Sequence, residues 1–410
     1  MSNQSLSEKL NGICDLFVLG LPPAEEQAAS RTFIPDPISL IGENSRKFES
    51  AVGELLESFG KVKGTVSPET VIDRLVPLIR EKKTNGITFT VGEADLFKRS
   101  ICDLPIRQFR AVRPILGVDV TRNTTPVKIG DFVIDFGRGI LPAPIDASEI
   151  GLTISPQVYD QLLIQATVKA RDTKTATGLA DALFYRFELI FRVLIGRRTD
   201  RVEVGIVNYR GPQMHDRFLL SEEGRYVQRG SSWDGAIQPF ILNDPHFPMP
   251  TGPCIRLFEL ISRDTNDLEK HVIRCAEWTG QAISEPNAAS ALVKAAIALE
   301  VLFSANEKGV ITPSIMAQIA ESCAFVLGTD ETSSVGIERR VKHLYSVRSA
   351  VVHSGKDSVD EKDLNDFISI CRKLVILLLS KEEFAKITSM SQLADYFKSR
   401  KYSLSPTSAS

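Results

Sequence analysis

Residues 344–355 read Leu-Tyr-Ser-Val-Arg-Ser-Ala-Val-Val-His-Ser-Gly, and this stretch predicts the end of an amphipathic helix. Its apolar residues recur with the spacing of one helical face, at Val341, Leu344, Tyr345, Val351 and Val352. Arg348 falls in the middle of that face. A guanidinium keeps its charge, so we expect it to need a carboxylate, a phosphate or water there. Gly355 is the residue type favoured just past a helix C-terminus, which predicts that the helix ends at about Ser354.

His353 lies in the last turn of this predicted helix, where unpaired carbonyl groups favour a positively charged imidazole. Histidine changes its charge near neutral pH, so beside a fixed cation it could transfer protons during cleavage of a phosphoester. The same pattern also fits a structural ion pair at Arg348 and a simple helix cap at His353. Spacing alone leaves both interpretations open.

The composition is that of an ordinary folded protein of two or three domains. The chain has 410 residues, 43% hydrophobic residues and a net charge of −2, which argues against a surface coated with nucleic acid. Six cysteines occur singly, without a Cys-x-x-Cys pair, which fits a reducing compartment and gives no sign of a metal site. The longest apolar run, 374–379, is too short to cross a bilayer, and no signal peptide is expected. We therefore expect a cytoplasmic protein without membrane contact, metal or cofactor.

Periodicity predicts an α+β N-terminal region followed by an all-α C-terminal helical bundle. The expected segments are a mainly helical part at 1–85, an α+β domain of no recognised family at 86–250, a helical domain at 265–385, and a short helix with a disordered tail at 386–410. Strands are expected at 87–91, 126–136, 163–170 and 202–207, and a strongly apolar helix at 178–195. The Pro-rich segment 243–250 is taken as the domain boundary. Beyond it, helices are expected at 265–283, 286–304, 312–327, 337–354, 360–380 and 391–399.

The C-terminal motif resembles the signature of the HEPN superfamily (higher eukaryotes and prokaryotes nucleotide-binding), an arginine followed after four to six residues by a histidine. The ApeA-like branch is the most similar, with Leu344-Tyr345, Arg348-Ser349 and His353-Ser354-Gly355 in the matching places. Upstream, residues 295–303 resemble the Ala-Leu-Glu-x-Leu helix of that branch and place Glu300 in it. The resemblance covers roughly residues 265 to 380, and its HEPN-like bundle is all-helical.

This resemblance implies RNA cleavage without a metal, through attack of the ribose 2′-hydroxyl on the adjacent phosphorus. His353 is then the expected acid and base, and Arg348 is expected to hold the phosphate oxygens. Ser349 is expected to orient the histidine or to bind substrate. Glu300, at the edge of its own apolar stripe, is expected to pair with Arg348, and Tyr345 to support the site. Alternatively, Glu300 only satisfies a buried arginine.

Helix geometry constrains how such a site could work. At about 100° per residue, Arg348 and His353 lie about 140° apart on an ideal helix. They converge only if the helix distorts near Ser354 or if two chains share the site. His343 is about 15 Å from His353 along the axis, too far to share one phosphate. If cleavage needs two histidines, both must be copies of His353, which predicts a homodimer through the 337–354 helix.

A local basic cluster surrounds the motif and could contact an RNA backbone. Between Glu338 and Lys356 there are five basic residues and one acidic residue. The candidate substrate-binding residues are Arg339, Arg340, Lys342 and Lys356. For Arg339 and Lys342 taken alone, an ordinary solvated helix face fits equally well.

Two functions of different classes follow. The first is a metal-independent RNA endonuclease of HEPN type, a bacterial antiphage defence or toxin effector whose N-terminal region senses a phage or cellular trigger. The second is a non-catalytic HEPN module for dimerisation or for nucleotide or RNA binding. His353 follows Arg348 at the short end of the family's spacing, which favours the second, whereas the retained arginine, serine and histidine favour the first.

Overall fold

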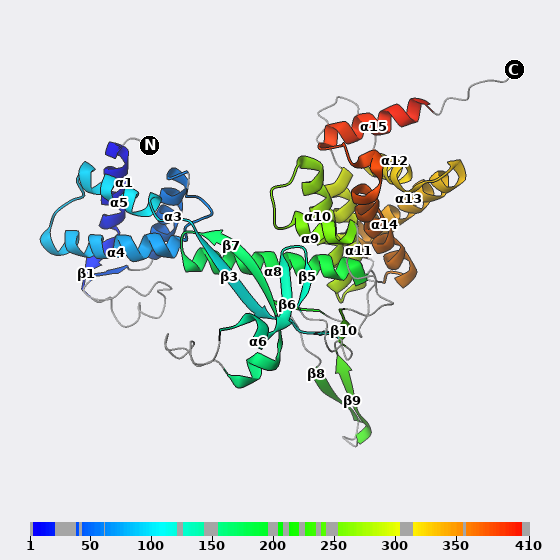
Figure 1. Ribbon diagram of the computed structural model, residues 1–410, viewed down its shortest axis with the longest axis horizontal. Helices are drawn as coiled ribbons and strands as arrows, with labels where there is room; N and C mark the ends of the chain where they lie inside the picture. Colours follow the sequence, from blue (N-terminus) through cyan, green and yellow to red (C-terminus); the bar gives the residue numbers. More distant parts are fainter. Residues whose placement is uncertain are drawn as a thin grey trace. The chain divides into compact units, whose positions relative to one another are not determined.

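The computed structural model in Figure 1 describes residues 3–20, 38–40, 43–60, 62–120, 126–142, 155–195, 204–207, 213–220, 226–234, 239–242, 253–303, 315–355 and 358–403. The chain forms two compact units. The first contains residues 1–111 and 167–181, and the second contains residues 112–166 and 182–410. The first unit therefore extends beyond the helical segment 1–85 and takes in the start of a later helix.

The first unit is mainly helical. It contains α1 (Asn3–Asp15), α3 (Glu43–Ser58), α4 (Pro68–Asn85), α5 (Val91–Cys102) and an antiparallel pair of short strands, β1 (Phe17–Leu19) and β2 (Ile38–Leu40). Apolar residues of all these elements form one core, in which the Phe17 and Phe48 rings meet edge to face at 5.1 Å. Helix α4 begins where Ser67 accepts a hydrogen bond from Thr70 N, and Pro68 occupies its first turn.

The strand expected at 87–91 is wrong, because Thr90 is the N-cap of α5. The Thr90 side chain accepts a hydrogen bond from Glu93 N, while the Glu93 side chain accepts one from Thr90 N. This reciprocal capping box outweighs the β-propensity of Ile87, Phe89 and Val91. The Thr-x-x-Glu pattern at 90–93 was a readable signal for this helix start.

A four-stranded sheet connects with the longest apolar helix of the α+β region. Its order is β3 (Arg107–Pro114), β7 (Leu162–Ala170), β6 (Phe132–Phe136) and β5 (Val127–Ile129), so the strands expected at 126–136 and 163–170 are confirmed. Helix α8 (Thr173–Ile195) contains the helix expected at 178–195, and its Phe187 ring lies 4.7 Å from that of Phe132 on β6. Phe187 also contacts Phe258 of α9 (Pro253–Leu260), which joins α8 to the helical part of the second unit.

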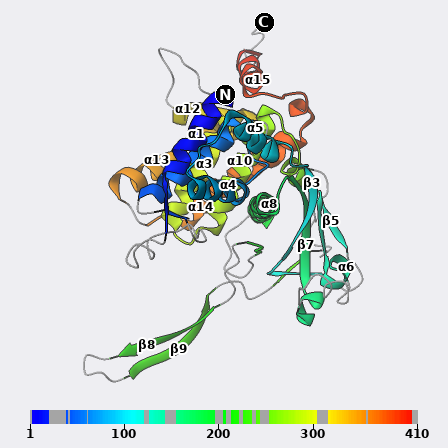
Figure 2. The same ribbon diagram turned by 90° about the vertical axis from the view of Figure 1, so that its left-hand side faces the viewer.

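Shorter strands complete the described α+β part of the second unit. β4 (Val118–Asp119) pairs in parallel with β10 (Phe240–Ile241), and β8 (Gln213–Leu220) pairs with β9 (Tyr226–Asp234) in an antiparallel hairpin that projects away from β5 and β6 (Figures 1 and 2). The strand expected at 202–207 is wrong for the part that the structure describes, because 204–207 contribute a single bridge between Gly205 and Leu116. The predicted boundary at 243–250 lies outside the described residues.

From α9 onward every described element is a helix, as the sequence predicts. The bundle consists of α10 (Asp267–Ser284), α11 (Ala288–Phe303), α12 (Ile315–Leu327), α13 (Glu331–Ser354), α14 (Glu361–Ser380) and α15 (Met390–Ser403). Helix α11 is its most apolar member and packs against α10, α13 and α14. The mixed α+β architecture with a C-terminal helical part is thus confirmed. Within the described ranges, no helix combines the length and apolarity that crossing a membrane requires.

Candidate functional site

The motif lies on α13, whose two ends are fixed by local sequence. Asp330 caps the N-terminus by accepting a hydrogen bond from Ser333 N at 2.8 Å. Gly355 ends the helix in the left-handed conformation at φ 63°, and its N–H donates to Ala350 O. The predicted end of the helix at Ser354 is confirmed, and its start lies six residues before the predicted 337.

The inner face of α13 is anchored by Val341, Leu344 and Tyr345, which are buried. The Tyr345 hydroxyl donates to Ala296 O on α11 at 3.2 Å, and its ring meets Phe367 of α14 edge to face at 5.8 Å. Burial, reinforced by the charge of Glu300, raises the pKa of Tyr345 far above its ordinary value. Tyr345 is therefore a neutral packing residue that sets the position of α13 one turn before Arg348.

Arg348 and Glu300 form the ion pair that the sequence predicts. Arg348 Nη2 lies 3.5 Å from Glu300 Oε1 on α11, and the two side chains are 28% and 29% exposed. The Arg348 Nε atom is enclosed and has no hydrogen-bond partner. This enclosed N–H is not accessible from solvent, so an incoming anion would contact the exposed part of the guanidinium, beside its ion pair with Glu300.

His353 and Ser349 lie on other sides of the same helix, and both are exposed. Because α13 remains α-helical through Ser354, the helix does not distort in the way that would bring His353 toward Arg348. The angle of about 140° between the two positions on a regular helix therefore holds here. One copy of the chain does not bring Arg348 and His353 together.

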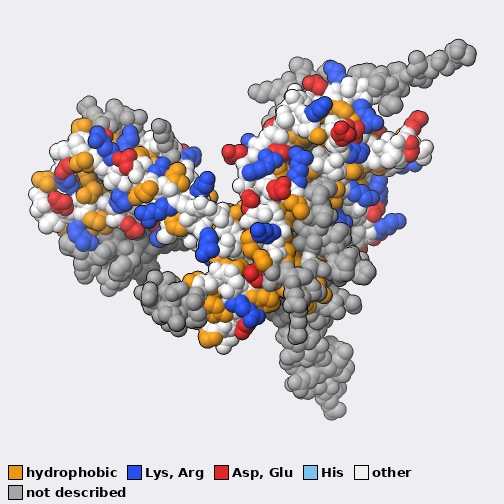
Figure 3. Space-filling view, in the orientation of Figure 1, with side chains coloured by type: hydrophobic (Ala, Val, Ile, Leu, Met, Phe, Trp, Pro, Cys, Tyr) orange, Lys and Arg blue, Asp and Glu red, His pale blue; other side chains and the backbone are white. Residues whose placement is uncertain are grey.

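The basic cluster expected to bind substrate separates into residues with different roles. Arg340 lies 2.7 Å from both Asp363 and Asp366 of α14, so its charge is neutralised between the two helices. Lys342 pairs with Glu338 on the same helix. Arg339 is exposed and pairs with no acidic residue in the described part of the chain, whereas Lys356 lies outside that part. Charged side chains of both signs lie over α13 and α14 on the face shown in Figure 3.

His343 contacts Asp363 of α14, which the sequence did not predict. Its Nε2 atom lies 3.4 Å from Asp363, whose side chain is 16% exposed, while His343 itself is 51% exposed. Burial would raise the pKa of Asp363, but hydrogen bonds from Arg340 and His343 hold it below its ordinary value. Asp363 is thus a carboxylate that holds both Arg340 and His343. Only the packing of α14 on α13 reveals this arrangement.

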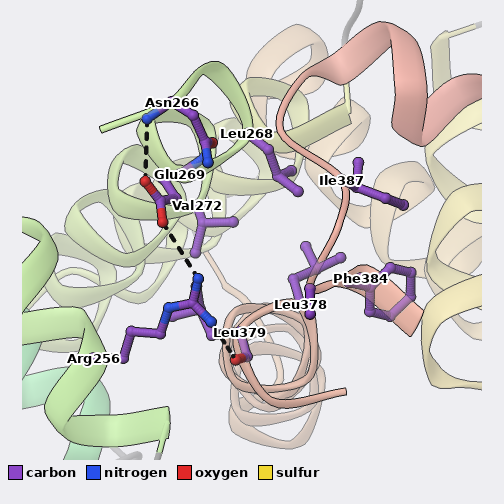
Figure 4. A pocket seen from close by; sticks show the side chains of 10 residues that line it. Arg256, Asn266, Leu268, Glu269, Val272, Leu378, Leu379, Phe384 and Ile387 are labelled. Carbon is purple, nitrogen blue, oxygen red and sulfur yellow. Dashed lines mark hydrogen bonds and ion pairs between the residues drawn. The ribbon is translucent and has the colours of Figure 1, made fainter. Parts of the chain in front are cut away.

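A pocket in the same bundle is too small for a nucleotide. Residues of α9, α10, α14 and the segment after α14 line it, among them Arg256, Glu269 and Phe384 (Figure 4). Its volume of about 20 Å³ accommodates one water molecule. Glu269 accepts hydrogen bonds from Arg263 at 2.9 Å and from Asn266 N at 3.1 Å. This hydrogen-bond network caps α10, so the polar residues that line the pocket already have a structural role.

The described residues hold no group of three His, Cys, Asp or Glu side chains that could bind a metal ion. Three thiols in the bundle, Cys275, Cys323 and Cys371, are buried and free. Burial raises the pKa of Cys275 to about 12 and also raises the pKa values of Cys323 and Cys371 well above the ordinary thiol value. They are neutral core residues, as the sequence predicts for scattered cysteines.

Comparisons with known proteins add no relative. No protein-family model matches the chain, and neither the curated proteins nor the solved structures yield a match. Function is therefore inferred from the residues of α11, α13 and α14.

Proposed function

We propose that this protein is a metal-independent RNA endonuclease of HEPN type. The observation that carries the proposal is the Arg348–Glu300 pair, which holds a partly exposed arginine at the C-terminal ends of two packed helices. His353 lies in the last turn of the same α13. In this proposal the ribose 2′-hydroxyl attacks the adjacent phosphorus, which forms a cyclic phosphate and releases a 5′-hydroxyl end. His353 transfers the proton, and Arg348 stabilises charge on the phosphate oxygens.

The proposal requires two copies of the chain. Arg348 and His353 face different sides of α13, so the histidine that acts in one site must be joined by a second His353 from a partner across a two-fold axis. The outer surface of the C-terminal half of α13 supports close approach of such a partner, because Ser346, Ser349 and Ala350 are small and uncharged. We therefore propose a homodimer through α13.

The N-terminal region is proposed to sense a trigger or to restrain the nuclease, in the manner of a bacterial antiphage defence or toxin effector. This part of the proposal is an analogy with the role of HEPN effectors.

Cleavage of RNA by the purified protein in EDTA tests the proposal. We expect cyclic phosphate ends from the wild-type chain and loss of cleavage in Arg348→Lys and His353→Gln. The control His271→Gln should leave activity intact, because His271 lies on α10 and its contacts are with Val301 O of α11 and with Asp267, not with α13. Activity retained in both motif variants would contradict the proposed site.

Mixing wild-type and His353→Gln chains tests the shared site. If each site needs two copies of His353, activity should fall as the square of the wild-type fraction, because mixed dimers are inactive. A linear fall would show that each chain works alone.

A non-catalytic HEPN module for dimerisation or for nucleotide or RNA binding is the second candidate. The separation of Arg348 from His353 on the helix favours it, because one copy of the chain contains no assembled acid–base pair. In that case the wild-type chain would form the dimer without cleaving RNA under any condition that promotes dimerisation.

A further inference from the structure

We infer that the N-terminal half of α13 binds the backbone of a single RNA strand through Arg339 and His343, with Asp363 holding His343 in place. This inference deepens the proposed function and depends on it for the identity of the ligand. It replaces the substrate-binding cluster read from the sequence with a different set of residues. Arg340 is excluded from the new set, and His343 is added to it.

The neighbouring side chains of Arg339 and Arg340 are held in different directions. Arg339 and Arg340 are neighbours in sequence, but on a helix they are about 100° apart. Arg340 contacts Asp363 and Asp366 of α14 at 2.7 Å, so it is already paired. Arg339 is exposed and has no ion pair with any described residue. An anion arriving from solvent therefore meets Arg339 first.

His343 lies on the same face of α13 as Arg339. It follows Arg339 by one turn, about 6 Å along the helix axis, and lies within about 40° of it around the axis. Its Nε2 atom lies 3.4 Å from Asp363, and half of its side chain remains exposed. The facing charged groups are Asp363 on α14 and Arg340, which shares that carboxylate. The arrangement fixes one side of the imidazole and leaves the other side open to solvent.

Arg339 and His343 share the outer face of α13 with His353. Arg339, His343, Ser346, Ala350 and His353 fall within an arc of about 80° on the outer face of α13, and all but the half-buried Ala350 are exposed. His343 and His353 are separated by about 15 Å along the axis. Along this face, side-chain N–H groups are supplied by Arg339, His343 and His353, whereas the Ser346 hydroxyl already donates to His343 O. This line of residues therefore begins with Arg339 and ends at the proposed cleavage site.

The chemistry of this line fits one strand of nucleic acid. Its donors suit phosphate oxygens, and none of the five residues on this line is aromatic and able to stack on bases, so binding should not depend on sequence. Recognition of double-stranded RNA needs contacts across successive grooves, whereas these residues follow a single line. The small, uncharged residues Ser346 and Ala350 on this face leave room for the partner copy, so RNA would reach the dimer axis from the Arg339 end.

Binding of a short 2′-O-methyl oligonucleotide, which lacks the attacking hydroxyl, tests the inference without cleavage. We expect Arg339→Gln and His343→Gln each to weaken binding by about five- to tenfold. Arg339→Gln should also reduce the slope of log affinity against log salt by about 0.7, the value for one lost cationic phosphate contact on a single strand. Arg138→Gln, on α6 (Gly137–Ile140) in the α+β part of the second unit, should leave both quantities unchanged. His271→Gln serves as the histidine control.

The outcomes separate this inference from the proposed function. Binding that depends on Arg339 and His343 without cleavage of natural RNA would support the surface and contradict the nuclease. Cleavage that depends on His353, with binding unaffected by Arg339→Gln and His343→Gln, would support the nuclease and overturn the surface. A chain that does not bind the oligonucleotide, or that binds a 2′-O-methyl duplex more tightly than the single strand, would also overturn it.

Discussion

The guanidinium of Arg348 on α13 pairs with the carboxylate of Glu300 on α11, with 3.5 Å between Nη2 and Oε1. Both side chains are more than two-thirds covered, so each would leave a poorly solvated charge if the other were removed. This pair joins two helices that also meet through Tyr345 and Ala296.

We expect Glu300→Ala to lower the free energy of unfolding by about 1–3 kcal/mol, between the values for exposed and buried pairs. Replacing both residues, as Glu300→Leu with Arg348→Met, should recover part of that loss because no charge then remains unpaired. Urea unfolding followed by circular dichroism measures both effects. Glu338→Ala, which breaks only the Glu338–Lys342 pair within α13, is the control and should change stability by less than about 0.5 kcal/mol. Equal effects of Glu300→Ala and Glu338→Ala would mean that the pair with Arg348 has no structural role.

Two adjacent arginines should behave differently when they are replaced. Arg340→Gln removes the contacts with Asp363 and Asp366 and should lower the free energy of unfolding by about 1–3 kcal/mol. Arg339→Gln removes an exposed side chain and should stay within about 0.5 kcal/mol of the wild type. The same urea titration measures both. A loss of stability in Arg339→Gln as large as in Arg340→Gln would contradict the assignment of Arg340 to the α13–α14 contact.

Gly280 on α10 lies against the backbone of Leu189 on α8. A Cβ atom at this position would lie 2.3 Å from Leu189 O on α8, and backbone atoms cannot move away easily. Gly280→Ala should therefore destabilise the protein by about 1–3 kcal/mol through overpacking. Gly178→Ala on α8, where no atom lies within 4 Å of the new Cβ, should instead stabilise it by about 0.5–1 kcal/mol. Thermal unfolding of the two variants should shift in opposite directions, and a shift in the same direction would refute the close contact.

The stability contribution of Glu93 in the first unit should depend on pH. A hydrogen bond from Lys82 at 2.6 Å, with further hydrogen bonds from Thr90, lowers the pKa of Glu93 from 4.5 to about 2. Since the folded state favours the carboxylate, this contribution is fully present above about pH 4.5 and is lost as the pH falls toward 2. Lys82 is 5% exposed, so Glu93→Gln should leave a buried ammonium without its partner at neutral pH.

Calorimetric melting temperatures of the wild type and Glu93→Gln measure this dependence. Their difference should be largest near neutral pH and should narrow between pH 4.5 and 2. A difference that stays constant over this range would show that the charge of Glu93 does not contribute to stability.

Local sequence was sufficient for the helices of the C-terminal part and for the end of α13. The glycine in the left-handed conformation and the regular apolar stripe act within one or two turns, so they can be read without knowledge of the neighbours. The cap at Asp330 is equally local, but the prediction missed it and began the helix at 337. The pairing of Glu300 with Arg348 was also predictable, because each charge interrupts or borders an apolar stripe and therefore needs a partner. The strand expected at 87–91 failed for a local reason, since the capping box at Thr90 is stronger than β-propensity.

Which charges remain available to a ligand was decided only by the tertiary structure. Arg339, Arg340 and Lys342 look equivalent in sequence, yet α14 neutralises Arg340 and presents Asp363 to His343. Sequence by itself determined the α+β and helical order of the chain, most of the helix ends and the face on which Arg348 lies. The packing of α14 against α13 determined the partners of the basic residues, because a helix turns about 100° at each residue and only a neighbouring element can select among the faces.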